Sequence, residues 1–188
     1  MTKTFVHLGC GPAHDRIPTE FVGWTEIRVD SDPAVLPDVV SSMTRVDLPD
    51  AAADGVYCCH SLEHLERWEV PVALAEMLRL LRPGGVAMIL TPDLEAWARD
   101  IVMNPSLLEV PRLHPAHGPI SVLDALFGPG LEVEAGNDHQ RHRTAFTSDS
   151  LYVRLVQAGF QEIVFNNVLW QIVVTATKPI SLKQEIAY

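Results

Sequence analysis

The sequence predicts an α/β domain built on a mostly parallel central sheet. Strand-like apolar runs alternate with helix-like segments along most of the 188 residues, the order expected when helices connect parallel strands. The first run, 4–8, breaks into Gly9-Cys10-Gly11, and the second run, 25–29, ends on Asp30. Glycines that allow close backbone approach, followed by a carboxylate after the second strand, are typical of a nucleoside site at the carboxyl ends of the strands.

The middle of the chain continues this alternation. Further strands are expected at 38–41, 54–59 and 85–90. Apolar residues recur at helical spacing from Glu69 to Leu81, which predicts a helix before the last of these strands. Proline cannot continue a helix, so Pro83-Gly84-Gly85 should end it, with the glycines forming a left-handed cap.

The second half has a helix, an irregular stretch and a final hairpin. A helix is expected from 92 to 102, and a long segment at 104–147, rich in proline and glycine, looks helical only at 120–127. Such a segment inside a compact domain is usually a functional lid or disordered, and we interpret it as a lid-like insertion in a single domain spanning 1–188.

The closing elements can also be assigned from local signals. Thr147 should cap a helix that ends at Gly159. Two strands at 161–166 and 168–177 should then form an antiparallel hairpin that turns at Asn166-Asn167. The apolar run 169–174 could present an exposed sheet edge, and a homodimer is therefore one expectation.

Charge and composition exclude several classes of partner. The net charge is −10 and the basic residues are scattered, which argues against nucleic acid or an anionic membrane as the main partner. No run reaches the roughly 18 apolar residues that cross a bilayer, and no secretory signal is visible at the start. Three cysteines, two of them adjacent, make a disulfide framework implausible. We expect a cytoplasmic protein that acts on a small molecule.

The glycine turn is incomplete as a dinucleotide fingerprint. That fingerprint needs a third glycine, where this chain has His14, and a helix whose amino end faces the pyrophosphate. The segment from Ala13 to Val22 is short and contains Pro18, so it leaves little room for such a helix. A nicotinamide-dependent oxidoreductase is therefore disfavoured, and a cofactor without a pyrophosphate is favoured.

A series of short motifs runs in order over roughly residues 5–165: Leu8-Gly9-Cys10-Gly11-Pro12, Val29-Asp30, Leu48-Pro49-Asp50, His60-Ser61-Leu62-Glu63-His64-Leu65, Arg82-Pro83-Gly84-Gly85, His142-Arg143-Thr144-Ala145-Phe146 and Ala158-Gly159-Phe160. Together these motifs resemble the small class I S-adenosylmethionine-dependent methyltransferases, in the type 11-like branch found among polysaccharide-biosynthesis enzymes. The resemblance implies a Rossmann-like methyltransferase fold, with helices on both faces of the sheet, and S-adenosylmethionine as cofactor.

The resemblance also implies roles for particular residues. Gly9, Cys10 and Gly11 would face the methionine half of the cofactor, and Asp30 would bind the ribose hydroxyls. The remaining implied contacts are Ser31 and Asp32 beside the adenosine, Ser42 and Met43 near the adenine, and His60 and Ser61 at the mouth of the site. The family usually carries an acid where this chain has Ser42.

The chemistry that the resemblance implies is in-line methyl transfer to a small polar acceptor, with a saccharide hydroxyl suggested only by the family analogy. A hydroxyl nucleophile benefits from a base that titrates near neutrality, which suits histidine. The candidates are His60, at the mouth of the site, and His139 and His142, on the expected lid.

Two alternatives of other classes stay open. His60-Ser61-Leu62-Glu63-His64 fits the H-x-x-E-H pattern of inverted zinc peptidases, but that chemistry needs both histidines on one helix face and His60 directly follows a strand-like run; we predict no metal. The other alternative is a non-catalytic cofactor-binding or interaction module of methyltransferase fold.

The thiols of Cys10, Cys58 and Cys59 have no feature of reactive cysteines.

Overall fold

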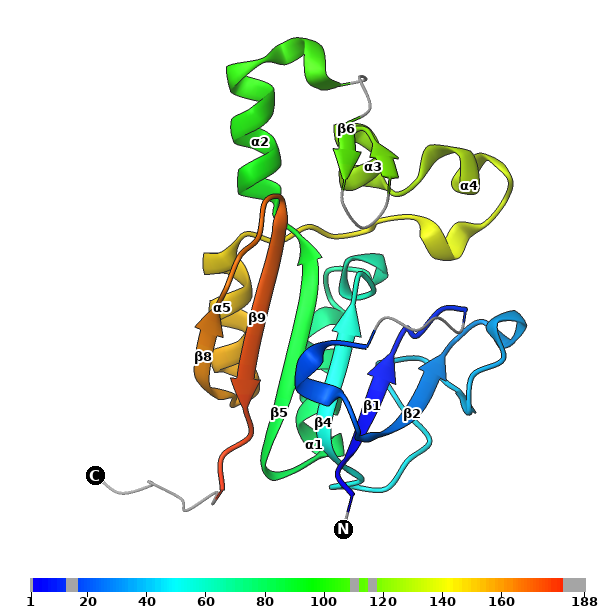
Figure 1. Ribbon diagram of the computed structural model, residues 1–188, viewed down its shortest axis with the longest axis vertical. Coiled ribbons are helices and arrows are strands. Elements are labelled where there is room, and N and C mark those ends of the chain that lie inside the picture. The colour runs from blue at the N-terminus through cyan, green and yellow to red at the C-terminus, as the bar shows by residue number, and fades with distance from the viewer. Residues whose placement is uncertain (1, 13–16, 109–111, 115–117, 181–188) are drawn as a thin grey trace.

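The computed structural model describes residues 2–12, 17–108, 112–114 and 118–180. A seven-stranded sheet forms its centre, in the order β3-β2-β1-β4-β5-β9-β8 (Figure 1). The strands are β1 (Thr4–Leu8), β2 (Thr25–Asp30), β3 (Val39–Val40), β4 (Ala53–Cys59), β5 (Leu81–Pro92), β8 (Gln161–Phe165) and β9 (Gln171–Thr177). The first five are parallel, and β9 runs antiparallel to both of its neighbours. The predicted mostly parallel sheet with an antiparallel final hairpin is confirmed.

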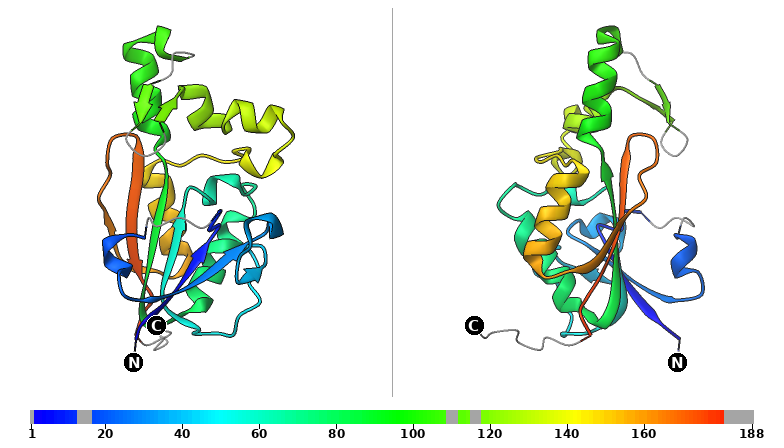
Figure 2. Two further views of the ribbon diagram at one scale, coloured as in Figure 1. Left: turned by 45° about the vertical axis from the view of Figure 1, so that its right-hand side comes forward. Right: turned by 90° about the vertical axis from the view of Figure 1, so that its left-hand side faces the viewer.

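Two long helices cover one face of this sheet. α1 (Val70–Leu80) and α5 (Ser148–Ala158) pack side by side on that face, as the edge-on view shows (Figure 2, right). Their buried side chains, such as Leu74, Met77 and Leu151, join the main hydrophobic core. The other face carries the short 3-10 helix η1 (Thr19–Phe21), whose Phe21 stacks on Phe5 with ring centroids 4.7 Å apart. Residues 13–16, part of the segment expected to be too short for a phosphate-binding helix, lie outside the described residues.

The end of α1 differs from its prediction. The helix stops at Leu80, and Leu81 is already extended with φ −73° and ψ 140°, so no left-handed cap forms there. Strand β5 begins at Leu81, which pairs with Ala53. Gly84 does have a positive φ of 77°, but within β5, where its N–H donates to the carbonyl of Lys178. Pairing with the sheet, rather than the glycines, ends the helix.

The final hairpin turns at a different place from the predicted one. Residues 166–167 form no turn, and the tight turn is Leu169-Trp170, flanked by hydrogen bonds between the backbones of Val168 and Gln171. Trp170 is held there because its indole N–H donates to Asp100 at 2.7 Å and its ring stacks on Trp97. The prediction that 169–174 forms a sheet edge was also wrong, because β9 lies between β5 and β8.

The segment 104–147 contains more regular structure than its composition predicted. After α2 (Leu94–Met103) come η4 (Pro105–Leu108), the small hairpin of β6 (Arg112–His114) and β7 (Gly118–Ile120), α3 (Val122–Phe127), α4 (Gly130–Glu134) and η5 (Asp138–Gln140). A capping box between Ser121 and Asp124 starts α3, and Trp97, Val122 and Ala125 form a small core of their own. In Figure 1 these elements lie beyond the carboxyl ends of the parallel strands.

None of the helices in the described ranges is long and apolar enough to cross a membrane.

Candidate functional site

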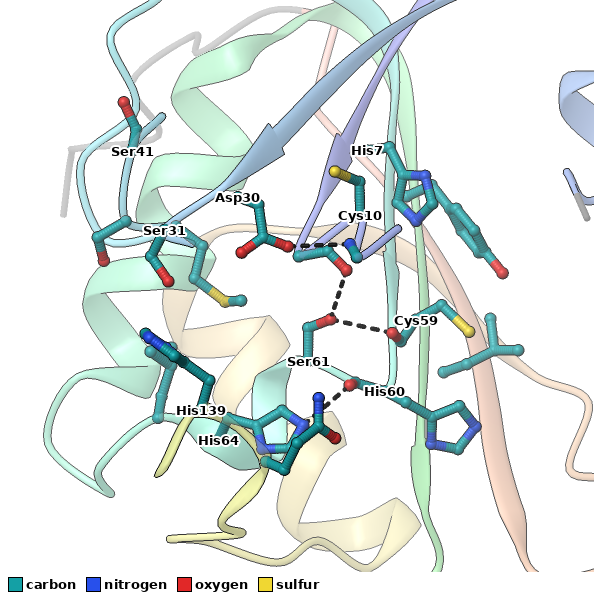
Figure 3. Close-up of a pocket in the computed structure, with 18 of the residues that line it drawn as sticks. His7, Cys10, Asp30, Ser31, Ser41, Cys59, His60, Ser61, His64 and His139 are labelled. Atoms are coloured by element: carbon teal, nitrogen blue, oxygen red, sulfur yellow. Dashed lines mark hydrogen bonds between the residues drawn. The ribbon is translucent and has the colours of Figure 1, made fainter. Parts of the chain in front are cut away.

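A cleft of about 750 Å³ opens at the carboxyl ends of β1, β2 and β4 (Figure 3). Strand order changes direction at β1, and ligands of open α/β sheets bind at such a point. Every residue expected to contact the cofactor, except Asp32, lines this cleft: Gly9, Cys10, Gly11, Asp30, Ser31, Ser42, Met43, His60 and Ser61. His139 also lines it, from η5, whereas His142 does not.

The glycine turn is built for close approach. Gly9 and Gly11 have φ of 63° and 57°, a region that L-residues enter only at a conformational cost. A Cβ on Gly9 would lie 2.2 Å from the hydroxyl of Ser61, so only hydrogen fits there. A Cβ on Gly11 would meet nothing within 4 Å. The Ser61 hydroxyl donates to the carbonyls of Gly9 and Cys59, at 3.1 and 2.9 Å, and so joins the β1 turn to the β4 turn.

Asp30 is held in place by the same turn. Its Oδ2 accepts from the N–H of Gly11 at 2.9 Å, and its Oδ1 accepts from the N–H of Asp32 at 2.9 Å. A carboxylate has about four acceptor sites, so both oxygens keep capacity for a ligand. The side chain of Asp32 instead accepts from Ala34 and caps the 3-10 helix η2 (Pro33–Val35). Asp32 therefore supports the loop beside the cleft and does not line the cleft itself.

Ser42 and Met43 border another part of the cleft, and Ser42 is uncharged where the resembled family usually carries an acid. Ser42 is exposed, and its hydroxyl is hydrogen-bonded to the hydroxyl and the N–H of Thr44. Met43 reaches back toward the glycine turn.

Burial raises the pKa of the Cys10, Cys58 and Cys59 thiols. The three thiols, two of them buried and that of Cys59 half-buried, are therefore protonated near neutral pH, as expected for structural cysteines.

His60 sits at the centre of a polar network at the mouth of the cleft. It follows β4 with a left-handed φ of 48°, an unusual conformation for a residue other than glycine. Its Nδ1 lies 3.3 Å from Oε1 of Glu63, which is 1% exposed and belongs to the 3-10 helix η3 (Leu62–His64). Thr91 donates to the other oxygen of Glu63 at 3.1 Å. On the opposite side of the imidazole, Nε2 lies 3.1 Å from the amide nitrogen of Gln171.

These contacts define the tautomer of His60. Burial raises the pKa of Glu63, but the hydrogen bond from His60 and the neighbouring histidine charges outweigh burial, and its pKa lies below the ordinary value. An ionised carboxylate only accepts, so Nδ1 carries a proton, and the Gln171 N–H donates to the lone pair on Nε2. The unprotonated nitrogen of His60 is therefore Nε2, on the side of the ring opposite the Glu63 carboxylate.

Glu63 and Gln171 are the residues of this network that sequence reasoning missed. Glu63 is visible in the sequence three residues after His60, but only as the acid of the H-x-x-E-H pattern and not as a partner of the His60 imidazole. Gln171 lies 111 residues from His60, at the start of an apolar strand, and its place follows from the pairing of β9 with β5. No local signal points to it.

His64 and His142 lie next to each other, between η3 and the segment 104–147. Both ring nitrogens of His64 lie 3.1 Å from carbonyl oxygens, those of His60 and Arg141, so His64 connects η3 to residue 141. His142 stacks edge-on against His64, and its Nδ1 donates to Ala125. The helical histidine pair of a zinc peptidase is not formed, because 62–64 is a 3-10 helix. The metal-capable side chains that converge among the described residues are Glu63, His64 and His142 instead.

Because burial lowers the pKa of His142 below its ordinary 6.5, the folded protein binds a proton there less readily than the unfolded chain. The free energy of unfolding therefore decreases as the pH falls through about 6.5, because the unfolded chain takes up a proton at this histidine more readily than the folded protein. We expect the free energy of unfolding of His142→Gln, measured in urea, to decline less than that of the wild type between pH 7.5 and 5.5. The difference in slope is limited to one proton, about 1.4 kcal/mol per pH unit. Equal slopes would contradict the prediction.

Comparison with known proteins agrees with this geometry. Residues 6–89 match the family model described as a methyltransferase domain. A probable S-adenosylmethionine-dependent methyltransferase of Mycolicibacterium smegmatis is 33% identical over 115 residues, covering 55% of this chain and 44% of the relative. The chain thus corresponds to less than half the length of that relative.

Solved structures share the architecture. The 1,6-didemethyltoxoflavin-N1-methyltransferase of Burkholderia thailandensis superposes with a TM-score of 0.61 and 19% identity, over 95% of this chain and 72% of its own. A possible histamine N-methyltransferase of Thermotoga maritima gives 0.60 and 14%, over 95% and 83%. The protein therefore has the Rossmann-like methyltransferase fold. The residues that match the methyltransferase domain model, 6–89, run from β1 into β5 of this fold.

Proposed function

We propose that this protein transfers the methyl group of S-adenosylmethionine to a small-molecule acceptor, with His60 as general base. The observation that carries the proposal is the hydrogen bond between Asp30 and the glycine turn, inside a cleft of about 750 Å³. This cleft lies where the strand order of the sheet changes direction.

The residues present fit this cofactor. Gly11 is open toward the cleft, so ligand atoms can lie against the backbone where a side chain would intrude. Asp30 offers acceptor sites for two adjacent hydroxyls, as a ribose presents them. Ser31, Ser42 and Met43 would border the adenosine half. When bound, S-adenosylmethionine supplies an electrophilic methyl group on a sulfonium, so the protein has to position the nucleophile and remove its proton.

The polar network supports His60 as that base. Nε2 is unprotonated and lies at the mouth of the cleft, where an acceptor O–H or N–H could replace the Gln171 amide as its donor. The Glu63 carboxylate would then stabilise the imidazolium that forms. Glu63 acts through His60 and is a positioning residue, whereas Gln171 marks the donor place at Nε2 that the acceptor would take. His139 and His142 are weaker candidates, since the first is exposed and the second lies outside the cleft.

The surroundings of the cleft suggest the kind of acceptor and partner. The segment 104–147 lies beyond the strand ends and would act as the lid of a single domain. A small molecule, rather than nucleic acid, suits the net charge of −10. The Burkholderia enzyme is named for a small heterocyclic substrate, which is compatible with that class. A homodimer and a cytoplasmic location stay predictions.

Titration of the protein with S-adenosylhomocysteine by calorimetry tests the cofactor site. We expect binding, and we expect Asp30→Asn to weaken it about 100-fold, because two hydrogen bonds to a charged acceptor are worth about 1.5 kcal/mol each. Asp32→Asn is the matched control: it removes a neighbouring carboxylate that caps η2 without lining the cleft, and it should change the affinity less than threefold.

Transfer of labelled methyl groups to a panel of small phenols, heterocycles and glycosides tests the activity. Binding without transfer to any of them would favour the non-catalytic module. No binding of S-adenosylhomocysteine would refute the proposed cofactor site.

A further inference from the structure

A second cavity, of about 370 Å³, adjoins the cofactor cleft on the lid side. It lies between β5, β9 and the helices α2, α3 and α4. Four residues line both spaces: His60, His64, Gln140 and Gln171. A molecule held in the second cavity therefore has its inner end beside His60, on the way to the cofactor.

The body of this cavity is apolar. Trp170 and Trp97 stack with ring centroids 4.8 Å apart, and Ile120 and Leu131 add aliphatic surface. Because the indole N–H of Trp170 donates to Asp100, the ring is the part of Trp170 suited to contact a ligand. Pro92 and Pro129 lack a backbone N–H altogether.

The polar groups of the outer wall are engaged within the protein. The carboxylate of Asp124 accepts from the N–H and hydroxyl of Ser121 and from the N–H of Gly130. His142 donates to the carbonyl of Ala125, and burial lowers its pKa, so it is neutral near pH 7. None of the described lining residues is a lysine or an arginine. An anionic acceptor would therefore find no positive partner.

These features discriminate between classes of acceptor. A saccharide carries a hydroxyl on nearly every carbon, and each one buried here without a partner would weaken binding. A planar aromatic ring matches the tryptophan surface, and a single polar group would reach the shared inner end. A cavity of this size suits about two fused rings.

We propose that the second cavity binds the methyl acceptor, and that this acceptor is a neutral aromatic molecule whose one nucleophilic O–H or N–H points at His60. This inference rests on the proposed function and replaces the saccharide expected from the sequence. The Gln171 amide marks the place that the nucleophile takes, because it is the donor that now faces Nε2 of His60.

Calorimetric titration of the S-adenosylhomocysteine-loaded protein with 2-naphthol, and in parallel with methyl α-D-glucopyranoside, tests the inference. We expect 2-naphthol to bind at least tenfold more tightly than the glucoside. Leu131→Asp should weaken 2-naphthol binding fivefold or more, because it places a charge on the apolar rim. Val102→Asp is the matched control: Val102 is 79% exposed and Leu131 84%, both beyond the sheet, but only Leu131 lines the cavity.

A second variant, Trp170→Leu, keeps apolar bulk but removes the ring, and should weaken 2-naphthol at least tenfold if its urea unfolding shows a folded protein. Tighter binding of the glucoside, or equal effects of Leu131→Asp and Val102→Asp, would overturn the inference. Binding of S-adenosylhomocysteine to the same samples distinguishes a failure of the acceptor inference from a failure of the proposed function. If it binds and 2-naphthol does not, the acceptor inference fails alone; if it does not bind, the proposed function fails.

Discussion

Replacing His60 with glutamine should lower the turnover number on the best acceptor of the methyl-transfer panel by about 100-fold or more, with the affinity for S-adenosylhomocysteine changed less than threefold. A positioned general base contributes about 10²–10⁴ to the rate. Glutamine retains much of the size of the side chain but cannot take up a proton near neutrality. Steady-state kinetics combined with calorimetry of the same samples measures both quantities.

Glu63→Gln provides the control that distinguishes a base held by a carboxylate from a merely structural contact. The neutral amide no longer stabilises the imidazolium, so turnover should fall. Nitrogen NMR of the free protein should show His60 protonated on Nδ1 and unprotonated on Nε2 in the wild type. Full turnover in His60→Gln, or a proton on Nε2 instead of Nδ1, would contradict the assignment.

Replacing Gly9 with alanine should destabilise the protein by about 3 kcal/mol and weaken S-adenosylhomocysteine binding at least tenfold. Two causes act together. An L-residue at φ 63° costs about 1–2 kcal/mol, and the new Cβ would lie 2.2 Å from the Ser61 hydroxyl, which must move and give up its contacts to the Gly9 and Cys59 carbonyls. Urea unfolding measures the first effect and calorimetry the second.

Gly11→Ala separates the two causes, because Gly11 has a similar φ of 57° but an open space around its added Cβ. It should cost only about 1 kcal/mol of stability. Adding Ser61→Gly to Gly9→Ala removes the atoms that clash and should restore part of the lost stability. If Gly9→Ala and Gly11→Ala destabilise the protein equally, close packing against Ser61 is not what requires glycine at position 9.

Local signals were sufficient for most of the fold. The helix of residues 70–80 was predicted by its apolar spacing, and the helix that begins after Thr147 was predicted by its cap and by Gly159, which has a φ of 100°. The cleft itself was also predictable, since Gly9, Gly11 and Asp30 follow the first two strands and parallel strands bring their carboxyl ends to one edge. For the two helices the controlling interactions lie within a few residues along the chain, whereas the cleft also needs β1 to pair with β2.

The sequence by itself determined the parallel sheet and its first two strand ends, because propensity, capping and turn chemistry act locally; the expected cofactor came from the family resemblance. Tertiary structure alone decided the ends of α1 and of the last hairpin, where pairing of Leu81 with Ala53 and docking of Trp170 on Trp97 and Asp100 overrode local preference. It also decided the surroundings of His60. Glu63 and Gln171 contact its imidazole, and the tryptophan-lined cavity borders it, only when segments up to 111 residues apart are packed together.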